Sequence, residues 1–212
     1  MKSEQQHRED IVRFGKMLHD RGYIAATDGN LSVRLDADTI LVTPTGMCKG
    51  MMEPDDLVVV DKNGRHVSGK RAVSSELAMH LLIYRMREDI NGICHAHPTT
   101  ATGYAAAGLA LNQALVSEVV LALGSIPLAQ YGTPGTPELT DALEPLVPEY
   151  DAILMANHGV VAYGDTLMRA YMNMETVEHF AKIALVTHML GRCQPLNAAQ
   201  VEKLVMRAKE SS

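Results

Sequence analysis

Two histidines separated by one residue carry the strongest chemical signal in this chain. Residues 93–97 (ICHAH) lie between Gly92 and Pro98 and read as a short buried strand. Side chains alternate along a strand, so His95 and His97 should point to the same face. At roughly 3.4 Å of rise per residue, two imidazoles about 7 Å apart can converge on one metal ion. Taken alone, the pair is also typical of hydrogen-bonded core histidines.

A third histidine and a carboxylate favour the metal interpretation. Residues 152–156 (AILMA) read as a buried strand, and Asn157, His158 and Gly159 follow at once. Gly159 allows a tight turn, which would place His158 where a strand ends, a usual place for sites in α/β folds. Three neutral imidazoles that leave one position open form a catalytic rather than a structural zinc site. We therefore predict a divalent metal site with the ligands His95, His97, His158 and Glu76.

The helix before the histidine pair offers a rival pair of ligands. Glu76 lies near the start of this predicted helix, and His80 lies four residues later on the same helical face. A metal site at the strand histidines needs a neighbouring carboxylate more than His80 does. Glu76 is therefore assigned to the strand histidines, as a ligand or an acid/base. Cys94 alternates with the two histidines and should face away from the metal as a small core residue.

Three turns rich in hydrogen-bond donors precede the histidines. Gly29 and Asn30 lie in a polar turn that enters a strand, although a simple loop also explains this pattern. A second small turn ends at Thr45 and Gly46, and a third stretch leads to residues 74–75, where a serine can cap a helix. Because a helix N-terminus binds phosphate readily, these features predict a phosphate pocket beside the metal. None of the turns fits a nucleotide-binding fingerprint.

Hydrophobic periodicity predicts alternating helices and strands around these turns. Residues 115–123 are apolar except at Ser117 and Glu118, and an exposed strand position explains Glu118 about as well as a functional role does.

No internal repeat, low-complexity tract or linker is evident, so residues 1–212 are predicted to form one domain. Helices are expected at residues 4–21, from 74 or 75 toward 91, 99–107, 136–146, 166–190 and 198–209. A strand is expected to follow the polar turn and run to residue 34, a hairpin over 35–42, and strands at 57–60, 93–97, 126–129, 152–156 and 160–163.

Composition narrows the class of protein. The chain has 212 residues, 47% of them hydrophobic and 21% charged, as in ordinary globular proteins. A formal net charge of -6 argues against a nucleic-acid partner. Residues 1–10 do not resemble a signal peptide, and no apolar run approaches the length of a membrane span. Three cysteines without paired spacing suit a reduced compartment, so a cytoplasmic location is expected.

Five motifs in order resemble those of one known family. They are Gly-Asn-Leu-Ser at 29–32, Thr-Pro-Thr-Gly at 43–46, Ser-Ser-Glu at 74–76, His-Ala-His-Pro at 95–98 and Asn-His-Gly at 157–159. Together they resemble the class II sugar-phosphate aldolase and adducin-head family, in its L-fuculose-1-phosphate aldolase branch, from about Arg8 to Leu190. The resemblance implies a three-layer α/β/α domain with a mostly antiparallel central sheet. It also implies a homotetramer with active sites between subunits.

The resemblance assigns roles to individual residues. The zinc ligands of the family fall on His95, His97 and His158, with Mn or Co as other possible metals, and its catalytic carboxylate falls on Glu76. Its phosphate contacts fall on Gly29, Asn30, Thr45, Gly46, Ser74 and Ser75. The implied reaction is reversible cleavage of a ketose 1-phosphate, such as L-fuculose 1-phosphate, to dihydroxyacetone phosphate and an aldehyde, with Glu76 moving the proton at the nucleophilic carbon.

Two departures from the family pattern affect the aldehyde side of this reaction. A tyrosine from a neighbouring subunit protonates the aldehyde oxygen in the best-known enzyme, whereas residues 116–118 here are Val-Ser-Glu. Glu118 could fill this role, and related dehydratases resemble this arrangement. The family's C-terminal tyrosine is also missing after Arg207.

Several rivals share the resemblance. A decarboxylase of oxo-tetronate phosphates, a methylthioribulose-phosphate dehydratase and a pentulose-phosphate 4-epimerase use the same zinc site. The decarboxylase branch tends to carry Lys where Ser75 stands, and the epimerase branch Asp at Glu76, so both departures favour the aldolase. A non-catalytic, adducin-like interaction domain predicts eroded ligands, whereas all three histidines and Glu76 are present.

Overall fold

The computed structural model describes residues 2–210, and their strands form one sheet. The strand order is β4-β3-β2-β1-β5-β8-β7-β6, and each neighbouring pair is antiparallel except β6 with β7. The mostly antiparallel sheet is therefore confirmed. The strands are β1 (Asn30–Arg34), β2 (Thr39–Val42), β3 (Val58–Asp61), β4 (His66–Ser68), β5 (Gly92–Ala96), β6 (Leu128–Ala129), β7 (Ala152–Met155) and β8 (Gly159–Gly164).

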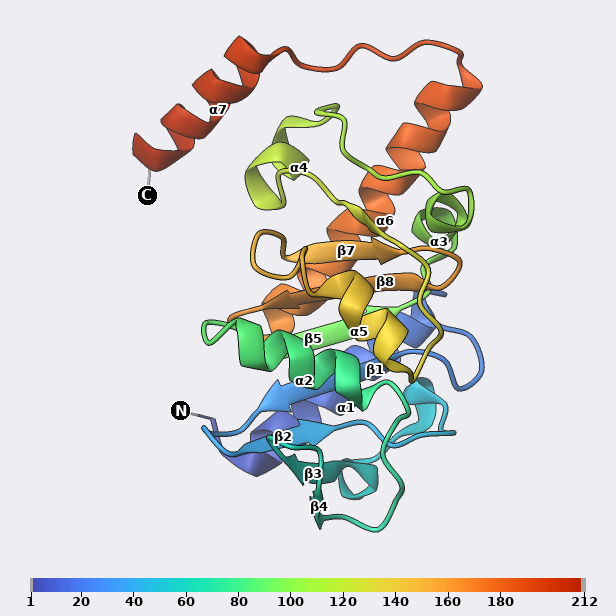
Figure 1. The fold of residues 1–212 in the computed structure, drawn as a ribbon, viewed down its shortest axis with the longest axis vertical. Helices are drawn as coiled ribbons and strands as arrows, with labels where there is room; N and C mark the ends of the chain where they lie inside the picture. The colour runs from blue at the N-terminus through green and yellow to red at the C-terminus, as the bar shows by residue number, and fades with distance from the viewer. Residues whose placement is uncertain (1, 211–212) are drawn as a thin grey trace.

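Helices cover both faces of this sheet and give the expected three layers. Figure 1 shows α2 and α5 in front of the sheet and α1, α3 and α6 behind it, while an extended segment carries α7 away from the body. The helices are α1 (Glu4–Asp20), α2 (Leu77–Met86), α3 (Thr99–Ala106), α4 (Ser117–Ala122), α5 (Pro137–Leu143), α6 (Leu167–Met189) and α7 (Ala198–Glu210), with short 3-10 turns at Lys49–Met51 and Pro54–Asp56. Across the described residues, none of the helices combines the length and apolar character that a membrane crossing needs.

Alternation along β5 divides the interior into two cores. Ile93 packs into the core under α2 and α5, whereas Cys94 packs into the core shared with α1 and α6. Both side chains are fully buried, and burial raises the pKa of the Cys94 thiol well above its usual range. Cys94 therefore faces away from the side of the strand that carries His95, as the sequence predicted.

The strand position considered for Glu118 is not found. Residues 117–122 form helix α4, in which Val119 is buried in the core and which packs against the helices α6 and α7. The apolar, β-branched sequence suited a strand, but tertiary packing overrode this local preference. Glu118 consequently lies on an exposed helical surface.

Strand register brings the functional turns together. Asn30 at the start of β1 pairs with His95 in β5, and Ala96 pairs with Val160 in β8. The first donor-rich turn and the turn that carries His158 therefore flank the end of β5, where the histidine pair lies.

Candidate active site

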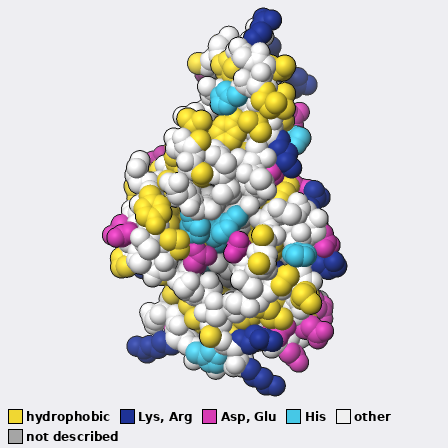
Figure 2. All heavy atoms as spheres, turned by 90° about the vertical axis from the view of Figure 1, so that its right-hand side faces the viewer, with side chains coloured by type: hydrophobic (Ala, Val, Ile, Leu, Met, Phe, Trp, Pro, Cys, Tyr) yellow, Lys and Arg dark blue, Asp and Glu magenta, His cyan; other side chains and the backbone are white. Residues whose placement is uncertain are grey.

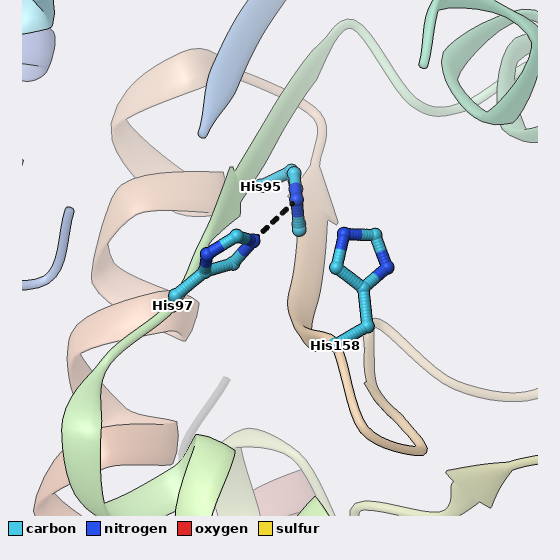
Figure 3. Close-up of side chains that lie close together, drawn as sticks. All are labelled: His95, His97 and His158. Atoms are coloured by element: carbon cyan, nitrogen blue, oxygen red, sulfur yellow. Dashed lines mark hydrogen bonds between the residues drawn. The ribbon is translucent and has the colours of Figure 1, made fainter. Parts of the chain in front are cut away.

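The three predicted histidines lie together. One ring nitrogen from each of His95, His97 and His158 lies within 4.8 Å of the others. His95 is fully buried at the end of β5, while His97 and His158 are partly accessible. Figure 3 shows the three rings facing one another, two from the β5 segment and one from the turn between β7 and β8. In Figure 2, histidine side chains gather beside acidic ones in the middle of this face of the molecule.

The donor set fits a divalent metal ion. Nδ1 of His95 lies 2.8 Å from the carbonyl oxygen of Val160 and donates to it, which leaves the Nε2 lone pair free to ligate. Nε2 of His97 lies 3.1 Å from Nε2 of His95. Two nitrogens bound tetrahedrally to one zinc at about 2.0–2.1 Å are about 3.3–3.4 Å apart, close to this spacing. Burial and then the neighbouring His95 lower the pKa of His97 to about 4, so its ring is neutral and able to ligate at pH 7.

The carboxylate of Glu76 completes the cluster. Oε2 lies 3.2 Å from Nε2 of His95, and Oε1 lies 2.9 Å from Nε2 of His158. Burial opposes ionisation of Glu76, but the neighbouring imidazoles of His95 and His158 outweigh it and hold the pKa of Glu76 well below its usual range. Among the described residues, Oε1 of Glu76 and Nδ1 of His158 are buried without a hydrogen-bond partner. An ionised carboxylate among imidazole nitrogens calls for positive charge, which a bound metal ion supplies.

The turn that carries His158 differs from the predicted one in the residue that makes it. Asn157 adopts the left-handed conformation, with φ +54°, and so makes the tight turn that had been assigned to Gly159. A Cβ on Gly159 would lie 2.4 Å from Cδ2 of His97 and 2.7 Å from the carbonyl oxygen of Ala96. Gly159 is therefore needed for the close approach of the turn to the histidine pair.

The predicted phosphate turns also meet in space. The backbone N–H of Thr45 donates to the carbonyl oxygen of Ala72 at 3.0 Å, and Pro44 forms a β-bridge with Val73. The Asn30 side chain donates to Oγ of Ser74 at 3.4 Å. Thr45, Gly46 and Ser75 are exposed, whereas Asn30 and Ser74 lie deeper. The three turns are thus linked to one another, and Asn30 connects them to Glu76 beside the histidine cluster.

Helix α2 begins later than predicted. Its first residue is Leu77, and neither Ser74 nor Ser75 caps it. Instead, the Glu76 backbone N–H donates to Oγ of Ser74 at 3.2 Å and forms a local turn. This turn leaves Glu76 outside the helix, where its side chain reaches the histidines rather than capping the helix.

The rival pairing of Glu76 with His80 is not formed. The fully buried His80 ring lies 2.5 Å from Oδ1 of Asn30 through Nε2 and 2.6 Å from Oγ of Ser32 through Nδ1. Both ring nitrogens are therefore engaged, and His80 lies outside the ligand cluster of the described residues.

Two charged residues near the cluster, Asp28 and Lys49, were not predicted from the sequence. Asp28 lies 3.5 Å from Nδ1 of His97, and it could have been suspected because it belongs to the turn before Asn30. Lys49 is buried and donates to the carbonyl oxygens of Thr27 at 2.6 Å and Met47 at 2.9 Å, so it ties two of the turns together. No local pattern distinguishes Lys49 from an exposed turn lysine.

Glu118 is not part of the cluster formed within one chain. It lies on α4, which Figure 1 shows apart from the end of β5. Its catalytic role stays a prediction.

The fold and this cluster define an α/β protein with a three-histidine cluster beside a carboxylate, a donor set that could hold a metal ion. Residues 9–185 match the family model described as Class II Aldolase and Adducin N-terminal domain. The chain is 37% identical over 190 residues to 3-oxo-tetronate 4-phosphate decarboxylase of Pectobacterium atrosepticum, covering 88% of this chain and 87% of that protein. It is 33% identical over 205 residues to 5-deoxy-D-ribulose 1-phosphate aldolase of Bacillus thuringiensis, covering 96% and 95%.

A solved structure has the same fold. An L-fuculose 1-phosphate aldolase superposes with a TM-score of 0.88 at 33% identity, covering 95% of each chain. The protein belongs to the class II aldolase and adducin N-terminal domain family.

Proposed function

We propose that the protein is a metal-dependent aldolase that reversibly cleaves a ketose 1-phosphate, of the L-fuculose 1-phosphate type, to dihydroxyacetone phosphate and an aldehyde. The observation that carries the proposal is the position of Glu76. Its ionised carboxylate lies 2.9–3.2 Å from two imidazoles of a three-histidine cluster and accepts a hydrogen bond from Asn30 at 2.7 Å. A positioned carboxylate beside a metal site suits proton transfer at a carbon next to a carbonyl.

The residues of the site have separate tasks in this proposal. His95, His97 and His158 would hold the metal, for which we propose Zn²⁺, and Glu76 is a fourth ligand when no substrate is bound. When bound, the ion supplies Lewis acidity for the negative charge that develops on the substrate oxygens. Glu76 returns a proton to the carbon that carried the broken bond.

The turns would bind the phosphate group. Backbone N–H groups around Gly29 and Gly46 and the side chains of Asn30, Thr45, Ser74 and Ser75 supply the donors. This binding would orient the reacting carbon toward Glu76.

A second candidate is decarboxylation of a 3-oxo-tetronate 4-phosphate, because the relative with 37% identity carries that name. The two reactions share one half. Loss of CO₂ from a 3-oxo-tetronate 4-phosphate leaves the same enediolate of dihydroxyacetone phosphate that aldol cleavage leaves. Only the aldol reaction also needs a group that exchanges a proton with the aldehyde oxygen.

The choice between the two reactions therefore depends on whether Glu118 can exchange this proton. Because Glu118 is exposed on α4, it would reach the reacting atoms only from a neighbouring copy of the chain. From the family resemblance we propose a homotetramer with active sites between subunits, an arrangement in which Glu118 would come from a neighbouring copy. We also propose a cytoplasmic location.

The test is an assay of the zinc-loaded protein with L-fuculose 1-phosphate, L-ribulose 1-phosphate and a 3-oxo-tetronate 4-phosphate. Dihydroxyacetone phosphate is measured for each substrate, and CO₂ release is measured in parallel. Product from a ketose 1-phosphate, lost in Glu76→Gln and His97→Ala, supports the aldolase. Product formed only with CO₂ replaces it with the decarboxylase, and no product from any of the three substrates refutes both.

A further inference from the structure

A chain of buried hydrogen bonds runs from the core to the carboxylate of Glu76. Oγ of Ser32 lies 2.9 Å from the hydroxyl of Tyr84 and 2.6 Å from Nδ1 of His80. Nε2 of His80 lies 2.5 Å from Oδ1 of Asn30, and Nδ2 of Asn30 donates to Oε2 of Glu76 at 2.7 Å. The proposed mechanism uses only the last two members of this chain.

Chemistry at the Glu76 end fixes the direction of each bond. An ionised carboxylate only accepts hydrogen bonds, so Asn30 must turn its NH₂ group toward Glu76 and its carbonyl oxygen toward His80. A carbonyl oxygen also only accepts, so Nε2 of His80 must carry the ring proton. Nδ1 then accepts from the Ser32 hydroxyl, whose oxygen accepts in turn from Tyr84.

Burial removes the other protonation state. Ser32 and the His80 ring lie in the protein interior, with exposures of 0% and 3%. Burial lowers the pKa of His80 to about 3, so the ring is neutral at physiological pH and has one N–H to donate. The arrangement therefore has one donor for each acceptor along its length.

We propose that His80 is a positioning residue that locks the side-chain amide of Asn30 with its NH₂ group toward Glu76. This inference rests on the proposed role of Glu76. The amide of a free asparagine rotates between two nearly equivalent shapes, and the wrong one would aim a carbonyl oxygen at the carboxylate. The N–H of His80 pairs only with the correct one.

The lock also affects the phosphate site. The NH₂ group of Asn30 donates both to Glu76 and to Oγ of Ser74, a residue of the proposed phosphate turns. The N–H of His80 thereby sets the orientation of Asn30 toward Ser74 as well as toward Glu76.

The first test reads the tautomer of His80 and does not depend on turnover. In ¹⁵N-histidine-labelled, zinc-loaded protein, long-range ¹H–¹⁵N spectra identify the protonated ring nitrogen by its couplings to the ring C–H protons. The His80 signals are assigned by their disappearance in His80→Gln. We expect a neutral Nε2–H ring at pH 7; an Nδ1–H or doubly protonated ring overturns the proposal, even if the protein proves to have another activity.

The second test separates the N–H of His80 from its bulk. His80→Leu fills the space but donates nothing, whereas His80→Gln can present an amide N–H to Asn30. On whichever substrate the protein turns over, we expect kcat/KM to fall about tenfold in His80→Leu and to recover to within about threefold of wild type in His80→Gln. His66→Leu on the exposed strand β4 makes the same chemical change outside the chain of bonds and should leave kcat/KM unchanged.

The pattern across the variants decides the outcome. Equal losses in His80→Leu and His80→Gln would assign a merely structural role to His80, and a His80→Leu enzyme with unchanged kcat/KM would show that Asn30 needs no lock. Either result overturns the proposal.

Discussion

Replacement of Gly29 by alanine tests the close contact between the turn at Gly29 and strand β5, which carries His95. Gly29 has φ +69°, and a Cβ there would lie 2.8 Å from the carbonyl oxygen of His95 and 2.7 Å from a methyl group of Ile24. The left-handed conformation costs a non-glycine residue about 1–2 kcal/mol. Pushing an extra carbon into a packed region costs about 1–3 kcal/mol more. We expect Gly29→Ala to lower the free energy of unfolding by about 2–5 kcal/mol.

Gly22→Ala is the matched control. Gly22 has φ +70°, but no atom lies within 4 Å of its added Cβ, so the control carries the conformational cost alone. Urea unfolding of both variants, followed by circular dichroism, should give a difference of about 1–3 kcal/mol between them. If the two variants lose the same stability, the close contact between Gly29 and the carbonyl of His95 does not constrain the site, and the reasoning fails.

Three further predictions follow from the buried charges. Glu76→Gln should lower kcat by about 10²–10⁴-fold while zinc, measured by atomic absorption, stays bound through the three histidines; an unchanged kcat in the zinc-loaded variant would contradict a role in proton transfer. Glu178→Gln should cost about 1–3 kcal/mol in urea unfolding, because this buried carboxylate accepts the N–H groups of Thr100 and Ala101 at 2.9–3.2 Å. The control is the partly buried Glu175, whose change Glu175→Gln should cost less than about 1 kcal/mol; equal losses would show that the N–H bonds to Glu178 do not stabilise the fold. Burial lowers the pKa of His80 to about 3 in the folded protein, whereas in the unfolded chain it has the ordinary value of about 6.5. As the pH falls below about 6.5, the unfolded chain therefore binds a proton that the folded protein does not, and the free energy of unfolding decreases. Between pH 7 and 5.5, wild type should therefore lose about 1 kcal/mol more stability than His80→Gln, and parallel curves would show that His80 is not held neutral.

The histidine cluster was predictable because its signals are local. A strand with alternate histidines fixes the relation of His95 to His97, and the Asn-His-Gly motif after a buried strand marks His158 as a residue at a strand end. Glu76 was identified from its place before these elements. Its departure from the helix, through the bond between its N–H and Ser74, had no local signal.

Other features depend on contacts between distant segments. The side-chain bond between Asn30 and Ser74 and the link from Lys49 to two turns come from strand register and loop packing, which a single sequence does not encode in a short pattern. The helical state of α4 had no clear signal for the same reason, since α4 packs against α6 and α7 and buries Val119. His80 was considered as a ligand because its helical spacing from Glu76 was visible, whereas its partners on β1 were not.

The contrast between buried and exposed parts of the site bears on how such proteins diversify. His95 lies in the centre of the sheet, paired on both sides, whereas Thr45, Gly46 and Ser75 lie on exposed turns. Substitutions in the sheet are costly, but surface turns accept them readily. A lineage with this architecture can therefore change its exposed turns while it keeps the buried histidine and the strand pairs around it. Two relatives about one-third identical to this chain, one named a decarboxylase and the other an aldolase, show that proteins of this family carry different reaction names.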